Sequence, residues 1–249
     1  FNSYLKKDLK LIFMPYEAQP FQNKFFLNAK KISNKINTIG YVHSPPEAFP
    51  VQSLIKNGYP EKLILNGKDQ KYCYKKFLGW KNKKIYILPS LRFRKRLQEK
   101  ISNKIFLPYS ILNQEEVIES INFIYKKRIA NIKKFRIQAH PLTSNTDTIK
   151  KFIQKIKHLN KIDGNFKQNK NLSIFIGASG AAGECLERGI QAIHISDNPI
   201  TDIYSKVLYP SLEVTKIKEG IFLYKLKKKG NLLMLGNNKI NLNYYLKKL

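Results

Sequence analysis

Short apolar runs alternate along this chain with longer segments in which apolar residues recur at helical spacing. The short runs, such as TIGYV at 38–42 and LSIFI at 172–176, have the length of buried strands and end in polar, Gly or Pro residues. In the longer segment 113–127, Val117 and Ile121 fall on one face of a helix. This alternation is typical of an α/β protein, and we expect that fold class.

The pattern predicts two successive series of strands and helices. Strands are expected at 9–15, 38–42, 62–66, 84–88, 104–107, 134–139, 172–176 and 192–195. Helices are expected at 21–31, 69–78, 113–127, 146–158 and 181–188. The charged stretch 91–104 has no buried pattern, and we interpret it as the connection between two Rossmann-like domains, residues 1–100 and 101–249.

A turn of small residues follows one of the strands predicted in the second series. Gly177, Ala178, Ser179 and Gly180 let a ligand approach the backbone, and a helix is predicted to begin directly after them. The free N–H groups of the helix N-terminus then face that ligand and suit a phosphate, to which Ser179 could add a hydroxyl donor. Glu184, about one helical turn further on, could accept hydrogen bonds from a ribose. A tight turn that needs small residues only for packing fits equally well.

A His-Pro pair, His140 and Pro141, ends another predicted strand of the second series. Proline forces the chain out of the strand, which leaves the imidazole at the carboxyl end of that strand. A histidine in this place could bind a donor phosphate or act as an acid toward a leaving phosphate. The alternative is a histidine that only caps a turn.

Together, the His-Pro pair and the serine-containing turn resemble the motifs of bacterial sialyltransferases and Kdo transferases. In those families both motifs contact the CMP of a CMP-activated sugar. The resemblance assigns His140 and Pro141 to the first motif, and Ser179 with its neighbours to the second. It implies a GT-B-type fold, in which two Rossmann-like domains face each other across a cleft. The second motif here reads Ser179-Gly180, in place of Ser-Ser or Ser-Thr.

The first domain contains two further candidates, Glu17 and His43. Each follows a predicted strand, so both are expected where α/β proteins place their ligands. The segment MPYEAQPFQNKFFLNAKK, followed by TIGYVHSPP, also resembles surface-carbohydrate biosynthesis proteins. Glu17 could act as a general base for an acceptor hydroxyl or stabilise an oxocarbenium-like state, with His43 as a second polar group. The alternatives are an acid at a helix N-terminus and a loop-capping histidine.

The formal net charge of +29 is the most extreme feature of the composition. Lys, Asn and Ile are enriched together, as in AT-rich genomes, so a solvated Lys-rich surface explains much of this charge. An anionic membrane surface, nucleic acid, an acidic glycan or a nucleotide phosphate would be the matching partners. The basic residues are spread along the chain and no known nucleic-acid-binding motif occurs, so we do not expect nucleic acid to be the partner.

The cysteines and the hydropathy indicate the compartment. Cys73 and Cys185 form neither a disulfide framework nor a zinc motif and suit a reducing cytoplasm. No apolar run reaches the roughly 18 residues of a membrane span. We expect a cytoplasmic protein that could be peripheral at the inner membrane. The chain begins with Phe1, which indicates a fragment or a processed chain whose first domain could be truncated.

These features predict a glycosyltransferase that moves a sugar from a nucleotide-activated donor, with a CMP-sugar favoured, onto a surface-polysaccharide or lipopolysaccharide-type acceptor. The acids form no Asp-x-Asp motif and do not cluster, so we expect a metal-independent enzyme with no cofactor besides its nucleotide-sugar substrate. Two alternatives stay open: another nucleotide-sugar enzyme, such as an epimerase or a glycerophosphate transferase, and a basic nucleic-acid-binding module. The segment 197–202 (DNPITD) could contact a ribose or sugar, or form an ordinary turn.

Overall fold

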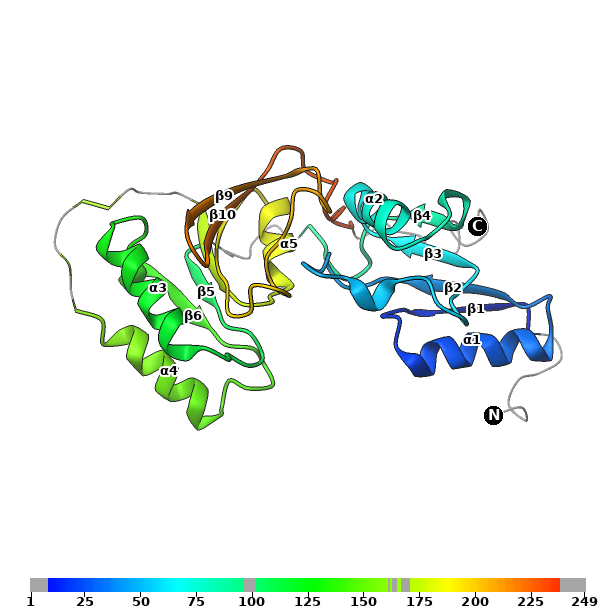
Figure 1. Ribbon diagram of the computed structural model, residues 1–249, viewed down its shortest axis with the longest axis horizontal. Helices are drawn as coiled ribbons and strands as arrows, with labels where there is room; N and C mark the ends of the chain where they lie inside the picture. Colours follow the sequence, from blue (N-terminus) through cyan, green and yellow to red (C-terminus); the bar gives the residue numbers. More distant parts are fainter. Residues whose placement is uncertain (1–8, 96–101, 161, 163–164, 167–170, 238–249) are drawn as a thin grey trace. The chain divides into compact units, whose positions relative to one another are not determined.

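The computed structural model describes residues 9–95, 102–160, 162, 165–166 and 171–237. These residues form two compact units, each with a sheet of its own (Figure 1). Unit 1 takes its described residues from 9–46, 50–95 and 230–237. Unit 2 contains residues 47–49 and the described part of the chain from 102 to 229.

Unit 1 is built on a parallel sheet whose strands follow one another in chain order. The strands are β1 (Leu11–Pro15), β2 (Asn37–Tyr41), β3 (Lys62–Leu65) and β4 (Ile85–Ile87). The helical segments are α1 (Pro20–Ile32), η2 (Val51–Ser53), α2 (Lys68–Phe77) and η3 (Asn82–Lys84). Because all four strands are parallel, the residues that follow them gather at one edge of the sheet.

An aromatic cluster around Trp80 joins the helices of unit 1 to the end of β1. The ring of Trp80 lies 5.3 Å from that of Tyr59, 6.2 Å from that of Tyr74 and 6.4 Å from that of Tyr16, centroid to centroid. Its indole N–H donates to the carbonyl of Ser53 at 2.9 Å, and the Tyr74 hydroxyl donates to the Ser53 hydroxyl at 2.9 Å. The cluster therefore buries a large apolar area while keeping these polar atoms hydrogen-bonded.

Unit 2 is built on a mixed sheet with the strand order β6-β5-β7-β8-β10-β9. Its strands are β5 (Lys104–Phe106), β6 (Arg136–Gln138), β7 (Leu172–Ile176), β8 (Gln191–Ile195), β9 (Leu212–Lys218) and β10 (Ile221–Leu226). Its helices are α3 (Gln114–Lys126), η4 (Ile132–Lys134), α4 (Asp147–Lys157) and α5 (Ala181–Glu187). The first four strands are parallel, and β10 joins them antiparallel, with β9 at the edge.

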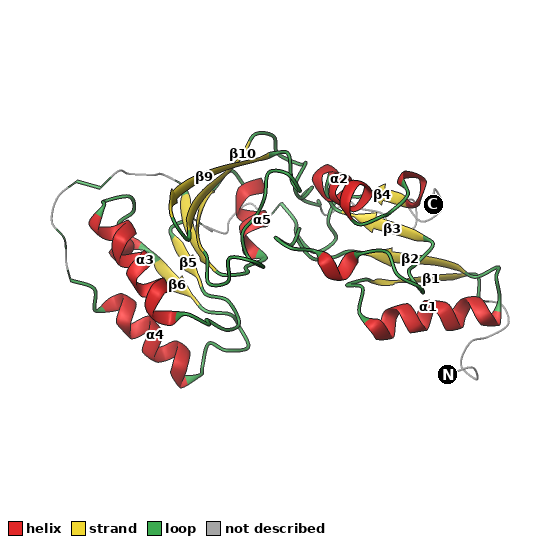
Figure 2. Ribbon diagram, in the orientation of Figure 1, coloured by secondary structure: helices red, strands yellow, loops and turns green. Residues whose placement is uncertain are grey.

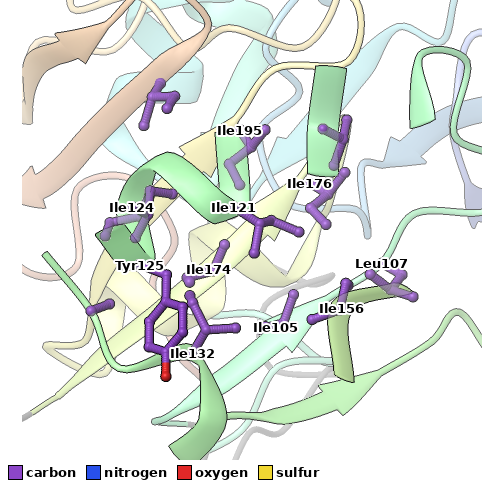
Figure 3. Close-up of a cluster of buried hydrophobic side chains, with 14 of the residues drawn as sticks. Ile105, Leu107, Ile121, Ile124, Tyr125, Ile132, Ile156, Ile174, Ile176 and Ile195 are labelled. Carbon is purple, nitrogen blue, oxygen red and sulfur yellow. The ribbon is translucent and has the colours of Figure 1, made fainter. Parts of the chain in front are cut away.

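Helices α3 and α4 pack together over alternate residues of the central strands of unit 2, and Figure 2 shows them as neighbours. Figure 3 shows Ile121 and Ile124 of α3 close to Ile174 of β7 and Ile195 of β8. All four side chains are fully buried. The buried residues recur at every second position along the strands and at every third or fourth position along the helix. Each element therefore buries a single face.

The α/β class is confirmed, and each strand and helix expected from the sequence is present in the described residues. The hairpin of β9 and β10 is an addition that the sequence analysis did not include. Its signals are the apolar residues Leu212 and Val214 at alternate positions and the turn at Gly220, whose φ is +73°. Among the described residues, no helix combines the length and the apolarity needed to cross a bilayer.

One expectation about the domains needs correction. The parallel sheet of unit 1 and the mixed sheet of unit 2 are consistent with the expected Rossmann-like α/β architecture, and the four described strands of unit 1 run in chain order. Residues 230–237, expected in the second domain, belong to unit 1. They pair with the loops that follow its strands, since the amide of Met234 donates to the Asn66 carbonyl at 2.6 Å and the amide of Ser90 to the Met234 carbonyl at 2.8 Å.

Candidate functional site

The strand order of unit 2 reverses between β5 and β7. The chain leaves β5 for β6 on one side and then returns to β7 on the other, so the loops after β5 and β7 diverge. In open α/β sheets such a switch point is the usual ligand crevice, at the carboxyl ends of the strands. The predicted small-residue turn, 177–180, directly follows β7, and Pro108 and Tyr109 follow β5. The structure therefore places this turn at the ligand-binding edge of the sheet.

Gly177 has a left-handed backbone conformation that would strain a larger residue, and the space around it is tight. Its φ is +57°, and a Cβ atom there would lie 3.3 Å from the Cβ of Asp197 and 3.6 Å from the Cγ of Pro108. The amide of Gly177 donates to the carbonyl of Ile195 at 2.9 Å. Within the described chain, the amides of the next three residues, 178–180, form no hydrogen bond. Successive amides after a left-handed residue can together bind an anion.

Glu184 lies one turn into α5, but its carboxylate is already engaged. It accepts hydrogen bonds from the guanidinium of Arg188, at 2.7 Å from Nη2 and 3.1 Å from Nε. Both side chains are largely shielded from solvent. The pair is an i,i+4 contact that stabilises a helix of seven residues. A ribose hydroxyl would have to compete with Arg188 for this carboxylate.

His140 and Pro141 follow β6, as predicted, and turn toward the loop after β5. The ring of His140 meets the ring of Tyr109 edge to face, with centroids 5.6 Å apart and an interplanar angle of 84°. Its Nδ1 accepts a hydrogen bond from the amide of Leu142 at 3.3 Å, and its carbonyl accepts one from the amide of Thr143 at 3.0 Å. These contacts place the imidazole beside one of the two loops that form the switch point. In the described residues, no hydrogen bond joins it to the turn at 177–180.

A buried histidine that the sequence analysis did not consider lies beneath the small-residue turn. His194 of β8 is 2% exposed, and its Nε2 lies 3.1 Å from the Gly177 carbonyl. Its Nδ1 lies 3.2 Å from the hydroxyl of Tyr224, which accepts a hydrogen bond from the amide of Tyr204 at 3.1 Å. The Tyr224 proton is then donated to Nδ1, which makes Nε2 the protonated nitrogen that donates to Gly177. The sequence feature that could have revealed this histidine is a polar residue inside AIHI, the otherwise apolar run at 192–195.

Burial sets the protonation state of this histidine. Desolvation lowers the pKa of His194 below its usual value, against the nearby Asp202 carboxylate and the hydrogen bond to Gly177, which raise it. Burial also raises the pKa of Tyr224, so its hydroxyl stays protonated and can donate. The neutral imidazole therefore donates a hydrogen bond to the Gly177 carbonyl and fixes the orientation of that peptide group.

Two aspartates order the loop that follows β8. Asp202 is 1% exposed and accepts hydrogen bonds from the Ser196 hydroxyl at 2.7 Å, the Asp197 amide at 2.7 Å and the Asn198 amide at 2.9 Å. Asp197 in turn accepts from the amides of residues 112 and 113 at 2.7 and 2.8 Å. Of the two readings offered for residues 197–202, the turn is the one observed. These carboxylates connect the loops after β5 and β8.

Glu17 and His43 of unit 1 lie together, as their positions after adjacent parallel strands predict. Oε1 of Glu17 lies 3.3 Å from Nε2 of His43, and their side chains are 45% and 27% exposed. His43 Nδ1 is shielded from solvent and has no hydrogen-bond partner among the described residues. The accessible part of the pair is therefore the Glu17 carboxylate with the Nε2 side of the imidazole, and two such groups in contact can take up or release a proton.

The backbone around Glu17 is held in an unusual conformation. Ala18 has φ of +56° although it is not glycine, and it is buried. The side-chain carbonyl of Gln22 accepts hydrogen bonds from the amides of Glu17 and Gln19, at 2.9 and 3.1 Å. Gln19 caps α1, so Glu17 lies outside the helix and is not the helix-terminal acid that the alternative proposed. Strained backbone of this kind often marks a functional position.

Tyr16 supports the same loop from the interior of unit 1. Its hydroxyl donates to the side-chain oxygen of Asn23 at 2.9 Å, and burial raises its pKa to about 12. The phenol therefore stays protonated and acts as a structural donor beside Glu17.

Comparison with known proteins adds no family to this geometry. No protein-family model matches the chain, and no curated protein matches it. Within the described residues, no three His, Cys, Asp or Glu side chains are grouped as metal ligands would be.

Proposed function

We propose that the chain is a glycosyltransferase that takes its sugar from a nucleotide-activated donor, with a CMP-sugar as the favoured class. The observation that carries the proposal is the coincidence of the strand-order reversal in unit 2 with the turn at 177–180. Three features support a phosphate at that turn: the left-handed Gly177, the amides of 178–180, which have no partner among the described residues, and His140 beside the neighbouring loop.

In this proposal unit 2 binds the nucleotide. The amides of 178–180 and the hydroxyl of Ser179 would neutralise the donor phosphate, and His140 with Pro141 would line the same edge. As the acceptor oxygen bonds to the anomeric carbon, the bond from that carbon to the phosphate oxygen breaks and the nucleotide leaves with the electron pair. Stabilising this leaving charge is the main catalytic contribution that unit 2 could make.

Unit 1 would supply the acid–base chemistry. Glu17 and His43 are 3.3 Å apart and remain partly accessible, so the proton of the acceptor hydroxyl can pass to this pair. The surface-polysaccharide or lipopolysaccharide-type acceptor, the GT-B arrangement of the two units, the metal-independent mechanism and the location at the cytoplasmic side of the inner membrane are parts of the same proposal.

Nucleotide binding to the full chain tests the proposal most directly. Thermal-shift titrations with CMP, CDP, UDP and GDP should show stabilisation by one of them, with CMP expected to be the strongest. His140→Ala should weaken that stabilisation at least tenfold in ligand concentration. His158→Ala, at the exposed end of α4, is the matched control and should leave it unchanged.

Each outcome of the titration decides a different part of the proposal. Stabilisation by UDP or GDP in place of CMP would keep the transferase and reject the CMP-sugar class. If none of the four nucleotides binds a folded chain, the switch point is not a nucleotide site and the proposed function is rejected. Equal losses in the two histidine variants would remove His140 from the site.

A further inference from the structure

One basic segment of unit 2 contains a single acidic residue. The whole chain has 46 Lys and Arg for 17 Asp and Glu, whereas residues 120–160 contain Asp147 as their single acid. The basic residues of this segment are Lys126, Lys127, Arg128, Lys133, Lys134, Arg136, Lys150, Lys151, Lys155 and Lys157.

Part of this segment surrounds a cavity of about 440 Å³ formed by η4, β6 and α4. The apolar side chains of Phe135, Ile137 and Ile153 line it. The basic side chains of Lys133, Arg136 and Lys157 also line it, and all three residues are exposed. The site therefore combines an apolar interior with a cationic rim.

None of the three rim cations is neutralised by an acid in the described part of the chain. Among the described residues, Lys150 pairs with Asp147, Arg188 with Glu184 and Lys216 with Glu219, so these acids are engaged elsewhere. The ammonium of Lys133 donates to the backbone carbonyl of Lys157, which holds the two basic residues on the same rim. Their charge is thus available to an anion from outside.

The cavity lies at the opposite end of the sheet from the candidate nucleotide site. It is formed at the amino end of β6 and the carboxyl end of α4, whereas His140 follows the carboxyl end of β6. In Figure 1, β6 and α4 are the two labelled elements that bound it. A ligand here would not occupy the nucleotide crevice.

We propose that this face of unit 2, formed by η4, β6 and α4, docks on a bilayer that contains anionic phospholipids. The phosphates would meet Lys133, Arg136 and Lys157, and the apolar part of a lipid would enter the cavity beside Phe135 and Ile153. Basic residues next to a membrane gain from its negative surface potential, and apolar contact adds to that gain.

The apolar lining favours a lipid over a nucleic acid. Proteins that bind single strands present exposed aromatic rings on which bases stack, and duplex readers insert an element into a groove. Phe135 is the one aromatic side chain of the cavity lining, and it is only partly exposed. Ile137 and Ile153 offer nothing to a phosphate backbone but suit an acyl chain.

Vesicle co-sedimentation of the full chain tests this docking. The protein should bind vesicles of phosphatidylcholine with 30–40% phosphatidylglycerol and should not bind pure phosphatidylcholine, at about 0.1 M salt. Each basic residue near such a surface increases partitioning by roughly fivefold. The triple variant Lys133→Gln, Arg136→Gln, Lys157→Gln should therefore lose at least tenfold in partitioning.

A control with the same charge change separates this face from the overall charge. Lys68, Lys75 and Lys81 are exposed residues of unit 1, and replacing all three by Gln should leave partitioning within about twofold. Equal losses in the two triple variants would overturn the proposal, as would failure of the wild type to bind the anionic vesicles. Tight binding of a duplex DNA probe, lost in the first variant alone and without vesicle binding, would assign the face to nucleic acid.

Discussion

Each unit contains a histidine beside a carboxylate, and the two pairs differ in almost every physical respect. In unit 1, Glu17 and His43 are 3.3 Å apart and their side chains are 45% and 27% exposed. In unit 2, His194 and Asp202 are 4.0 Å apart and both side chains are 2% exposed. A histidine beside a carboxylate thus occurs in contact with solvent in one unit and in the core of the other.

The hydrogen bonds around each pair explain the difference. Asp202 accepts three hydrogen bonds, and both nitrogens of His194 are satisfied, so neither group has capacity left for a substrate. His43 keeps one nitrogen without a partner among the described residues. A buried pair whose hydrogen bonds are complete serves structure, whereas a pair whose carboxylate is 45% exposed can exchange protons with a ligand through that carboxylate.

The largest effect should follow from removing the buried carboxylate. Asp202→Ala leaves the Ser196 hydroxyl and two backbone amides without their acceptor, and we expect a loss of about 2–4 kcal/mol in the free energy of unfolding. Asp147→Ala, whose side chain is 89% exposed, should change it by no more than about 0.5 kcal/mol. Urea denaturation followed by circular dichroism measures both. Similar values for the two variants would show that the Asp202 network does not support unit 2.

The second effect concerns catalysis and falls on the exposed pair. Glu17→Gln keeps the shape of the side chain but removes its charge and basicity, so the rate of sugar transfer should fall by about 10²–10⁴-fold. His43→Gln should lower it by a comparable factor, and the double variant should lose little more, because the two residues act as one unit. Transfer rates are measured with the nucleotide-sugar that binds. Fully additive losses would show that Glu17 and His43 act separately.

The sequence predicted the pair in unit 1 better than the one in unit 2. Residues that follow adjacent parallel strands meet at one edge whatever the core contains, so Glu17 and His43 could be placed near each other from the positions of their strands. His194 lies inside a strand, and its role depends on Tyr224, which belongs to the hairpin missing from the sequence analysis. Residues 230–237 are held in unit 1 by backbone hydrogen bonds. Such bonds do not depend on the type of side chain, so the sequence contains no pattern that predicts them.

The third effect is a pH dependence specific to the buried histidine. In the unfolded chain an imidazole titrates near pH 6.5. Burial lowers the pKa of His194 in the folded chain, so below about pH 6.5 the unfolded state binds a proton that the folded state does not. Stability should be complete above that pH and should fall, by up to about 1.4 kcal/mol per pH unit, as the pH is lowered.

The variant His194→Gln distinguishes the proton that binds to His194 from protons that bind to other groups. Its amide can still donate to the Gly177 carbonyl, but it cannot be charged, so its stability should be lower at pH 7.5 and should depend less on pH between 7 and 5.5. Urea denaturation at several pH values measures the two slopes. Parallel slopes for wild type and variant would assign the pH dependence to other groups.

The smallest effect completes the comparison of the two pairs. Glu17→Ala removes a partly exposed contact with His43, and such contacts contribute about 0–1 kcal/mol to stability. The fluorescence of Trp80, the single tryptophan of the chain, reports on unit 1 and provides the measurement. A loss well above 1 kcal/mol would mean that Glu17 fixes the strained turn at Ala18 rather than serving chemistry. If Glu17→Ala lowers the free energy of unfolding only slightly and Glu17→Gln lowers the transfer rate strongly, Glu17 acts on the ligand and not on the stability of the fold. The exposed pair would then serve catalysis, whereas the buried pair of His194 and Asp202 serves stability.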